Sequence, residues 1–118
     1  MGFNFNNETP IYIQIIEEIK QRIIRGMYVV NQKIPSVRDL AFEFEVNPNT
    51  VVKALVELEN LGLIFTDSTN GKFVTTNEEL IKGVKNKEVI VRINEFLQSM
   101  QQIGLNKQEI IELLNGRD

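Results

Sequence analysis

The chain has 118 residues, of which 42% are hydrophobic and 25% are charged, which predicts one compact core with a small appendage. Neither cysteine nor histidine occurs, so disulfide scaffolds, Cys/His zinc sites and catalysis by a thiol or an imidazole are excluded. We therefore expect no enzyme, no metal site and no cofactor. The chain also has no apolar run of about 18 residues and no basic and apolar signal segment at its start, so we expect a cytoplasmic protein without a membrane span.

The first predicted helix begins at Thr9-Pro10, with Thr9 as the capping residue, and ends near Gly26. Its apolar side is predicted from residues spaced by four, namely Ile11, Ile15, Ile19, Ile23 and Met27. Phe3 and Phe5 are spaced for one face of an extended arm that lies across the domain. After an irregular stretch, Lys33-Ile34 is a candidate short strand.

Two further helices are joined by a very short turn. Ser36 caps the first of them, and Asn47 caps the second, where Pro48 occupies the first helical position. Only Glu45 and Val46 separate the two helices, which favours a crossing near a right angle and predicts a helix-turn-helix. The predicted buried residues are Val37, Leu40, Ala41 and Phe44 in the first helix, and Val51, Ala54, Leu55, Leu58 and Leu61 in the second, which Gly62 ends.

A β-hairpin is predicted directly after this motif. Segments 63–66 and 72–75 are rich in β-branched and aromatic residues and flank D-S-T-N-G, in which Asn70-Gly71 is a strong hairpin signal. A helix-turn-helix followed by a hairpin is a winged helix. The predicted fold is therefore mainly α with a small β-hairpin, and residues 1–76 form a winged helix-turn-helix domain.

Residues 77–118 are predicted to be a helical dimerisation segment. A long helix starts at T-N-E-E, with Thr76 and Glu79 as a capping box, and continues to about residue 100; Asn106 and Glu109 cap a short final helix. The long helix has a wide apolar stripe, which either covers the winged helix or seals a second copy of the chain. We favour a homodimer because the stripe is hard to hide in so small a monomer. The predicted interface residues are Val89, Ile93, Phe96, Leu97, Met100 and Ile103.

The second helix of the helix-turn-helix has a polar side that can read DNA. At about 100° per residue, Asn49, Thr50 and Lys53 lie together opposite the apolar side, close to the capping residue Asn47. Short amide and hydroxyl groups near the start of a helix suit base edges, and Val52 on the flank suits a thymine methyl group. An equally weighted alternative is that Asn47 and Thr50 only cap the helix and that Lys53 is a solvated charge.

Charge and the remaining polar residues refine this hypothesis. Residues 1–76 contain 7 Lys or Arg against 9 Asp or Glu, so any positive surface for DNA must be local rather than global. The free N–H groups at the start of the helices after Ser36 and Asn47 are natural phosphate partners. Arg38 is expected to contact a phosphate rather than a neighbouring acid, and Lys72 offers a similar contact from the hairpin.

Five segments resemble the N-terminal domain of GntR-family bacterial transcription regulators. They are P-I-Y-I-Q-I at 10–15, Gly26, I-P-S-V-R-D-L-A at 34–41, V-N-P-N-T-V-V-K-A-L at 46–55 and L-E-N-L-G-L-I at 58–64. The resemblance implies a DNA-facing surface that includes Arg38, Asn47, Pro48, Asn49, Thr50 and Lys53, with the wing glycine Gly71 near the minor groove. The wing departs from the family's G-x-G-x-F-V pattern, because Thr69 replaces the first glycine.

The short helical tail is similar to that of the YtrA subfamily. This resemblance implies a dimer formed through the C-terminal helices, no dedicated ligand pocket and, commonly, control of operons for ABC transporters. The candidate DNA-binding residues are Ser36, Arg38, Asn47, Pro48, Asn49, Thr50, Lys53, Gly71 and Lys72. We predict a homodimeric repressor that binds double-stranded DNA at a near-palindromic operator, its two recognition helices about 10 bp apart. The alternative is a winged-helix module for protein contact, without sequence-specific DNA binding; the sequence identifies neither an operator nor an effector.

Overall fold

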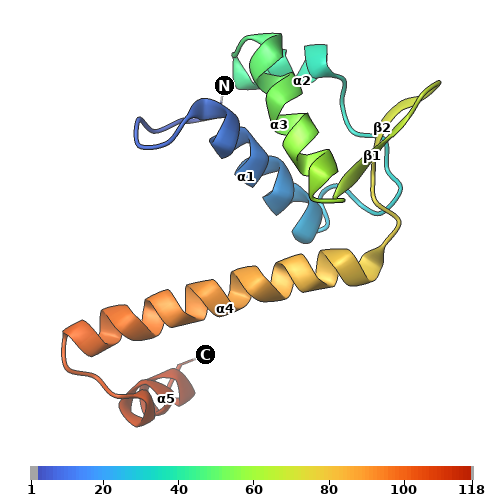
Figure 1. The fold of residues 1–118 in the computed structure, drawn as a ribbon. Coiled ribbons are helices and arrows are strands. Elements are labelled where there is room, and N and C mark those ends of the chain that lie inside the picture. The colour runs from blue at the N-terminus through green and yellow to red at the C-terminus, as the bar shows by residue number, and fades with distance from the viewer. Residues whose placement is uncertain (1–2, 118) are drawn as a thin grey trace. The chain divides into compact units, whose positions relative to one another are not determined.

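The computed structural model describes residues 3–117 and confirms the predicted fold class (Figure 1). In chain order its elements are α1 (Ile11–Ile24), α2 (Val37–Phe44), α3 (Pro48–Asn60), β1 (Ile64–Asp67), β2 (Gly71–Val74), α4 (Glu78–Gln102) and α5 (Lys107–Asn115). The chain forms two compact units, Met1–Lys82 and Gly83–Asp118. The first unit contains the helix-turn-helix and the β-hairpin, so it is the unit that positions the candidate site.

Helix α1 buries the predicted isoleucine side, but both of its ends differ from the prediction. Ile15, Ile19 and Ile23 are buried, whereas Ile11 and Met27 at the two ends are 43% and 55% exposed. Thr9 does not cap the helix. Pro10 occupies the N-cap position and makes no side-chain hydrogen bond there. The helix therefore begins at Ile11, one residue later than it would if Thr9 were the cap.

Helices α2 and α3 form the predicted helix-turn-helix. The turn is made by Glu45, which adopts a left-handed conformation with φ 57°, and the N–H of Val46 donates to the carbonyl of Ala41 at 3.0 Å. Helix α3 buries Val51, Ala54, Leu55 and Leu58 against α1, α2 and β1. Leu61, predicted to be buried, is 51% exposed because the helix ends at Asn60 and the chain turns at Gly62, where φ is +80°.

The N-terminal arm covers α2 without forming a strand. Phe3 and Phe5 pack edge-on against each other, and the Phe3 ring meets the ring of Phe44 with centroids 5.7 Å apart. The predicted position of the arm across the domain is therefore confirmed. Its aromatic rings add apolar contact to the α2 side of the core.

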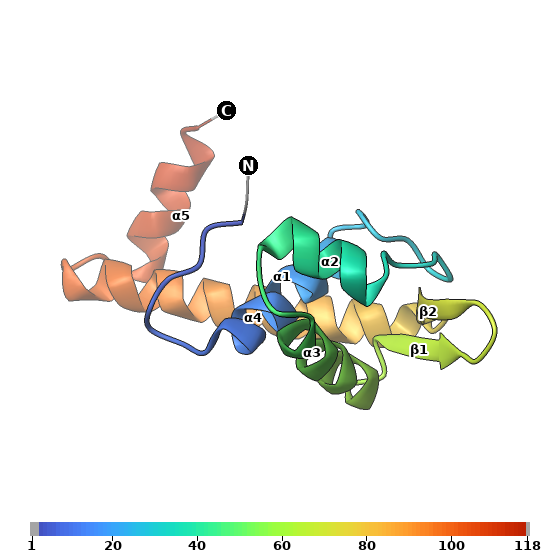
Figure 2. The same ribbon diagram turned by 90° about the horizontal axis from the view of Figure 1, so that it is seen from above.

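The wing is an antiparallel hairpin that projects from the helices in both views (Figures 1 and 2). Its register pairs Ile64 with Val74 and Asp67 with Gly71, so Asn70-Gly71 is not a two-residue turn. The Asp67 carboxylate instead accepts hydrogen bonds from Thr69 and Asn70, and Gly71 follows with φ +103°, a conformation that favours glycine. Lys33 forms an isolated β-bridge with Phe73. The short strand predicted at 33–34 is therefore reduced to one paired residue.

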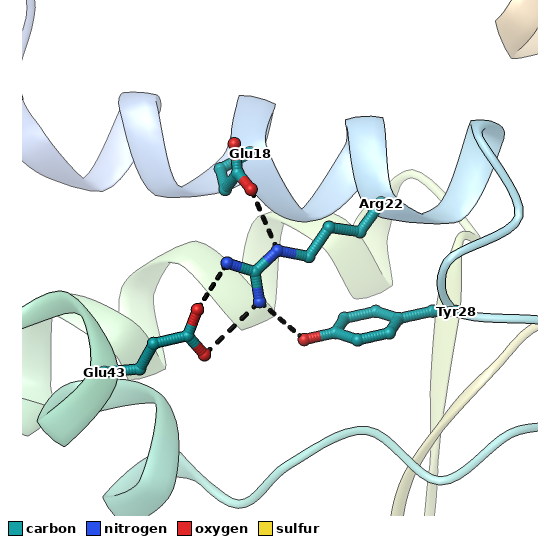
Figure 3. A network of polar contacts seen from close by, with 4 residues as sticks. All are labelled: Glu18, Arg22, Tyr28 and Glu43. Carbon is teal, nitrogen blue, oxygen red and sulfur yellow. Dashed lines mark hydrogen bonds and ion pairs between the residues drawn. The ribbon is translucent and has the colours of Figure 1, made fainter. Parts of the chain in front are cut away.

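A polar network ties α1 to α2 (Figure 3). The Arg22 guanidinium donates to the carboxylates of Glu18 and Glu43 and to the hydroxyl of Tyr28. Burial alone would lower the pKa of Arg22, but these hydrogen bonds outweigh burial and raise the pKa above its ordinary value. The guanidinium also lies over the Phe44 ring, with its central carbon 5.3 Å from the ring centroid.

The second unit contains most of α4 and the whole of α5. Asn77, and not the predicted Thr76, caps α4 by accepting from the N–H of Leu80 at 3.1 Å; the hydroxyl of Thr75 in turn accepts from the N–H of Asn77. The predicted capping box of Asn106 and Glu109 at α5 is confirmed. Within the described residues, no helix is both long and apolar enough to cross a membrane.

The Arg22 network should contribute measurably to the stability of the first unit. We expect Arg22→Met to lower the free energy of unfolding by about 2 kcal/mol, because two carboxylates lose a charged donor in a half-buried setting. Urea unfolding at fixed protein concentration measures this change. Lys20→Met is the matched control; its surface pair with Glu17, at 3.0 Å, should contribute less than about 0.5 kcal/mol. Equal losses in the two variants would contradict the assigned role of Arg22.

Candidate nucleic-acid interface

The start of α3 is held by its own capping residue. The side-chain carbonyl of Asn47 accepts from the N–H of Asn49 at 2.8 Å, and Pro48 occupies the first turn. The capping role considered for Asn47 is therefore confirmed, although its amide N–H groups are not used in that bond. Thr50 is half-buried, and the structure assigns its side chain no capping bond among residues 3–117.

One stripe of α3 is exposed along its length. Asn49, Val52, Lys53 and Val56 are all exposed, with Val52 at 44% and Val56 at 48%. At about 100° per residue these four positions lie within about 100° of one another, away from the buried side. Val56 was missed by the sequence analysis. Its signal was available, because it follows Val52 by one helical turn and is not part of the buried apolar spacing.

Tyr12 on α1 lies against Lys53 of α3. The Lys53 ammonium nitrogen is 4.0 Å from the centroid of the Tyr12 ring, a distance at which the ring face attracts a cation. Lys53 is nevertheless exposed, so its ammonium lies on the ring face on one side and stays accessible to solvent on the other. Helical spacing does not indicate this contact, because Tyr12 and Lys53 are far apart in the chain.

The start of α2 presents a second cation. Ser36 uses its hydroxyl oxygen to accept from the N–H of Asp39 at 3.1 Å, which caps the helix. Arg38 is exposed in the first turn of α2, and no carboxylate of the described residues lies within ion-pair distance of it. Because α2 packs against α3, Arg38 and Lys53 belong to the same helix-turn-helix.

Lys72 in the wing is engaged within the protein. Its ammonium donates to the hydroxyl of Thr66 at 2.7 Å and to the carboxylate of Glu59 at 3.1 Å. Thr66 also donates to the second carboxylate oxygen of Glu59 at 2.9 Å. A DNA contact by Lys72, as the sequence suggested, would require this three-residue cluster to open.

The cations of the first unit fall into two groups. Lys20, Arg22 and Lys72 each have a carboxylate within 3.1 Å, and Lys82 has one at 3.9 Å. Ion pairs are absent, in the part of the chain that the structure describes, for the other four cations, which are Arg25, Lys33, Arg38 and Lys53. Two of these unpaired charges, Arg38 and Lys53, lie on the helix-turn-helix, at the exposed start of α2 and on the exposed stripe of α3. The local positive surface that an acidic DNA-binding chain requires is therefore present at these two positions.

Comparison with known proteins identifies the family. The model of bacterial regulatory proteins, gntR family, matches residues 11–74, which are α1, the helix-turn-helix and the wing. The chain belongs to the gntR family. This GntR protein is 34% identical over 112 residues to YhcF, an uncharacterised HTH-type transcriptional regulator of Bacillus subtilis (strain 168); the match spans 95% of this chain and 93% of YhcF. The resemblance found in the sequence is confirmed.

Other relatives describe what this GntR chain is similar to. The HTH-type transcriptional repressor YtrA of Bacillus subtilis (strain 168) is 42% identical over 79 residues, which span 65% of this chain and 61% of YtrA. A GntR family transcriptional regulator from Listeria monocytogenes superposes with a TM-score of 0.86 at 34% identity, covering 97% of this chain and 100% of that one. These relatives are transcription regulators and not enzymes.

A DNA complex is also among the similar structures. The DNA-binding domain of AraR in complex with operator ORX1 superposes with a TM-score of 0.56 at 33% identity, covering 64% of this chain and 90% of that one.

The pKa of Glu59 tests whether the cluster of Glu59, Thr66 and Lys72 forms in solution. The hydrogen bond from Thr66, followed by that from Lys72, lowers the pKa of Glu59 below its ordinary value. A carboxylate with a lowered pKa stabilises the fold above its unfolded-state pKa, and this contribution is lost as the pH falls through the folded-state value.

We expect Thr66→Val and Lys72→Met each to raise the pKa of Glu59, with the larger effect from Thr66→Val. A side-chain carbon NMR titration measures this. Asp67 serves as the internal control, since its pKa is lowered by Thr69 and Asn70 instead and should not change. A Glu59 titration that neither variant moves would show that the cluster does not form in solution.

Proposed function

We propose that the chain is a cytoplasmic, homodimeric repressor that binds a near-palindromic operator in double-stranded DNA. Each copy places the exposed start of α3 in the major groove, and the two α3 helices lie about 10 bp apart on one face of the duplex. The AraR complex supports this proposal, because a DNA-binding domain that is 33% identical is bound to its operator. YtrA, a named repressor, supports the direction of regulation.

The distribution of unpaired cations is the observation that carries the proposal. The chain has a net charge of −3, yet the exposed cations Arg38 and Lys53 have no acidic partner within residues 3–117. Exposed cations on the helix-turn-helix that have no acidic partner are available for phosphate contact, and each neutralised phosphate releases a bound counterion.

The residues between these cations suit base edges. Asn49 is exposed and directly follows Pro48. Its side-chain amide can donate one hydrogen bond to adenine and accept another from it. Val52 and Val56 offer methyl groups to thymine on the same stripe. Lys53 and Arg38 then provide the phosphate contacts that set the orientation of the helix.

A second copy of the chain is the proposed occupant of the apolar stripe on α4. No residue of α4 is buried, and Ile93, Phe96 and Ile103 are 50%, 43% and 69% exposed. With Val89 and Met100 these residues lie within about 80° around the helix, as in a helix-pairing seam. Leu97 is half-buried and lines a groove of about 470 Å³ between α4 and α5 with Leu105 and Ile110. A helix of 25 residues with no fully buried residue in its own chain would gain stability from association.

The phosphate contacts predict how binding depends on salt. For an operator selected from genomic fragments of the host, Lys53→Ala and Arg38→Ala should each weaken binding and reduce the slope of log affinity against log salt by about 0.9. Asn49→Ala should instead relax the base preference at one position in each half-site, at a cost of about 1–3 kcal/mol in discrimination. Gel-shift titrations over a salt series measure both effects.

Lys20→Ala is the matched control for these variants. It removes one cation that is paired with Glu17 on α1, so the salt slope should stay unchanged. A wild-type chain that retains no genomic fragment selectively at low salt would refute the proposal and would favour a winged helix used for protein contact.

The dimer has its own test. We expect Phe96→Asp to shift the chain from dimer to monomer in sedimentation, because a carboxylate would be buried in an apolar seam. Operator affinity should fall by about 100-fold or more, since two linked half-sites are then bound separately. Lys87→Gln changes the net charge equally on the opposite side of α4 and should leave the dimer intact. A monomeric wild-type protein with full operator affinity would contradict this assignment.

A further inference from the structure

Lys72 of the wing is engaged within the protein, whereas Lys33, which lies beside the wing, has no ion pair among residues 3–117. The Lys72 ammonium is bound to Thr66 and Glu59, and its side chain is only 29% exposed. To reach DNA it would have to give up two partners and leave a carboxylate unpaired beside the duplex. Lys72 is therefore a poor candidate for the wing's contact to DNA.

Lys33 lies beside the turn of the wing. It bridges to Phe73, and the N–H of the next residue, Ile34, donates to the carbonyl of Lys72 at 3.0 Å. A methyl group at Gly71 would stand 3.2 Å from Cε of Lys33 and 3.9 Å from its Nζ. Because Gly71 has no side chain, the Lys33 stem can lie across this end of the wing.

The Lys33 charge is accessible. Lys33 is exposed, and no carboxylate within residues 3–117 forms an ion pair with it. It lines a cleft of about 490 Å³ between the wing and the start of α2, together with Ser36, Asp67 and Asn70. Asp67, the acid of that cleft, is committed to the turn, since its two oxygens accept from Thr69 and Asn70.

We infer that Lys33, and not Lys72, is the wing's contact to a backbone phosphate of the DNA. This inference rests on the proposed function and adds to it a cation that the sequence analysis did not include. A compact ammonium on a flexible stem binds phosphate as a point charge and needs no fixed geometry. The cleft joins the wing to the capped start of α2, so the contact extends the phosphate-binding side of the helix-turn-helix toward the wing.

The test compares a variant that removes the charge of Lys33 with a variant that removes the charge of Lys72. We expect Lys33→Gln to reduce the salt slope by about 0.9 and to weaken binding by about five-fold near 0.15 M salt, equally for the operator and for unrelated duplexes. The double variant Lys72→Gln with Glu59→Gln removes the half-buried pair without changing the net charge, and its slope should equal that of the wild type. Lys33→Arg should restore the slope.

The outcomes separate this inference from the proposed function. If the wild type binds its operator but Lys33→Gln leaves the slope unchanged, or if the double variant lowers the slope as much, the assignment of Lys33 is wrong while DNA binding stands. A loss confined to operators of one sequence would show a base contact and would overturn the phosphate assignment. Thermal unfolding of Lys33→Gln should match the wild type, because the ammonium has no ion-pair partner among residues 3–117. A lowered midpoint would show a structural role instead.

Discussion

Burial of one side of α3 fixes the direction in which its other side points, and the candidate interface depends on that constraint. Val51, Ala54, Leu55 and Leu58 are each at most 1% exposed, and the valine and the two leucines contribute about 1.5–3 kcal/mol each when fully buried. A shift of the helix by one residue would rotate it by about 100° and expose this set. The exposed stripe with Asn49 and Lys53 is therefore held in place by the core.

Charge is organised around the same helix. The chain is acidic overall, but its acids are used where cations would otherwise compete for DNA: Glu43 holds Arg22, and Glu59 holds Lys72. The cations of the helix-turn-helix are left without such partners among the described residues. An acidic net charge disfavours non-specific binding to nucleic acid, so under the proposed function the remaining positive positions would act only where the surface of α3 fits the DNA. Membership of the gntR family agrees with this arrangement.

Local patterns predicted most of the fold, and contacts between distant residues were not predictable. Helical spacing gave the buried sides of α1, α2 and α3, while the caps of α1 and α4 were assigned wrongly because Thr9 and Thr76 each adjoin a second residue able to begin the helix. The Lys72–Glu59 pair joins residues that are 13 apart in the chain, and neither helical nor strand spacing indicates such a pair. The contact between Tyr12 and Lys53 could not be predicted for the same reason. The seam on α4 stays a prediction, because one chain contains only half of it.

In the proposed dimer, the exposed start of α3 enters the major groove of DNA twice, once from each copy of the chain. Chemical footprinting of the chain on a selected operator measures this most directly, since reagents that modify guanine N7 report major-groove contact. If the chain binds as proposed, we expect two protected patches in successive major grooves, about 10 bp apart on one face of the duplex. Protection limited to the minor groove, or two patches at a spacing that does not match a helical turn, would contradict it.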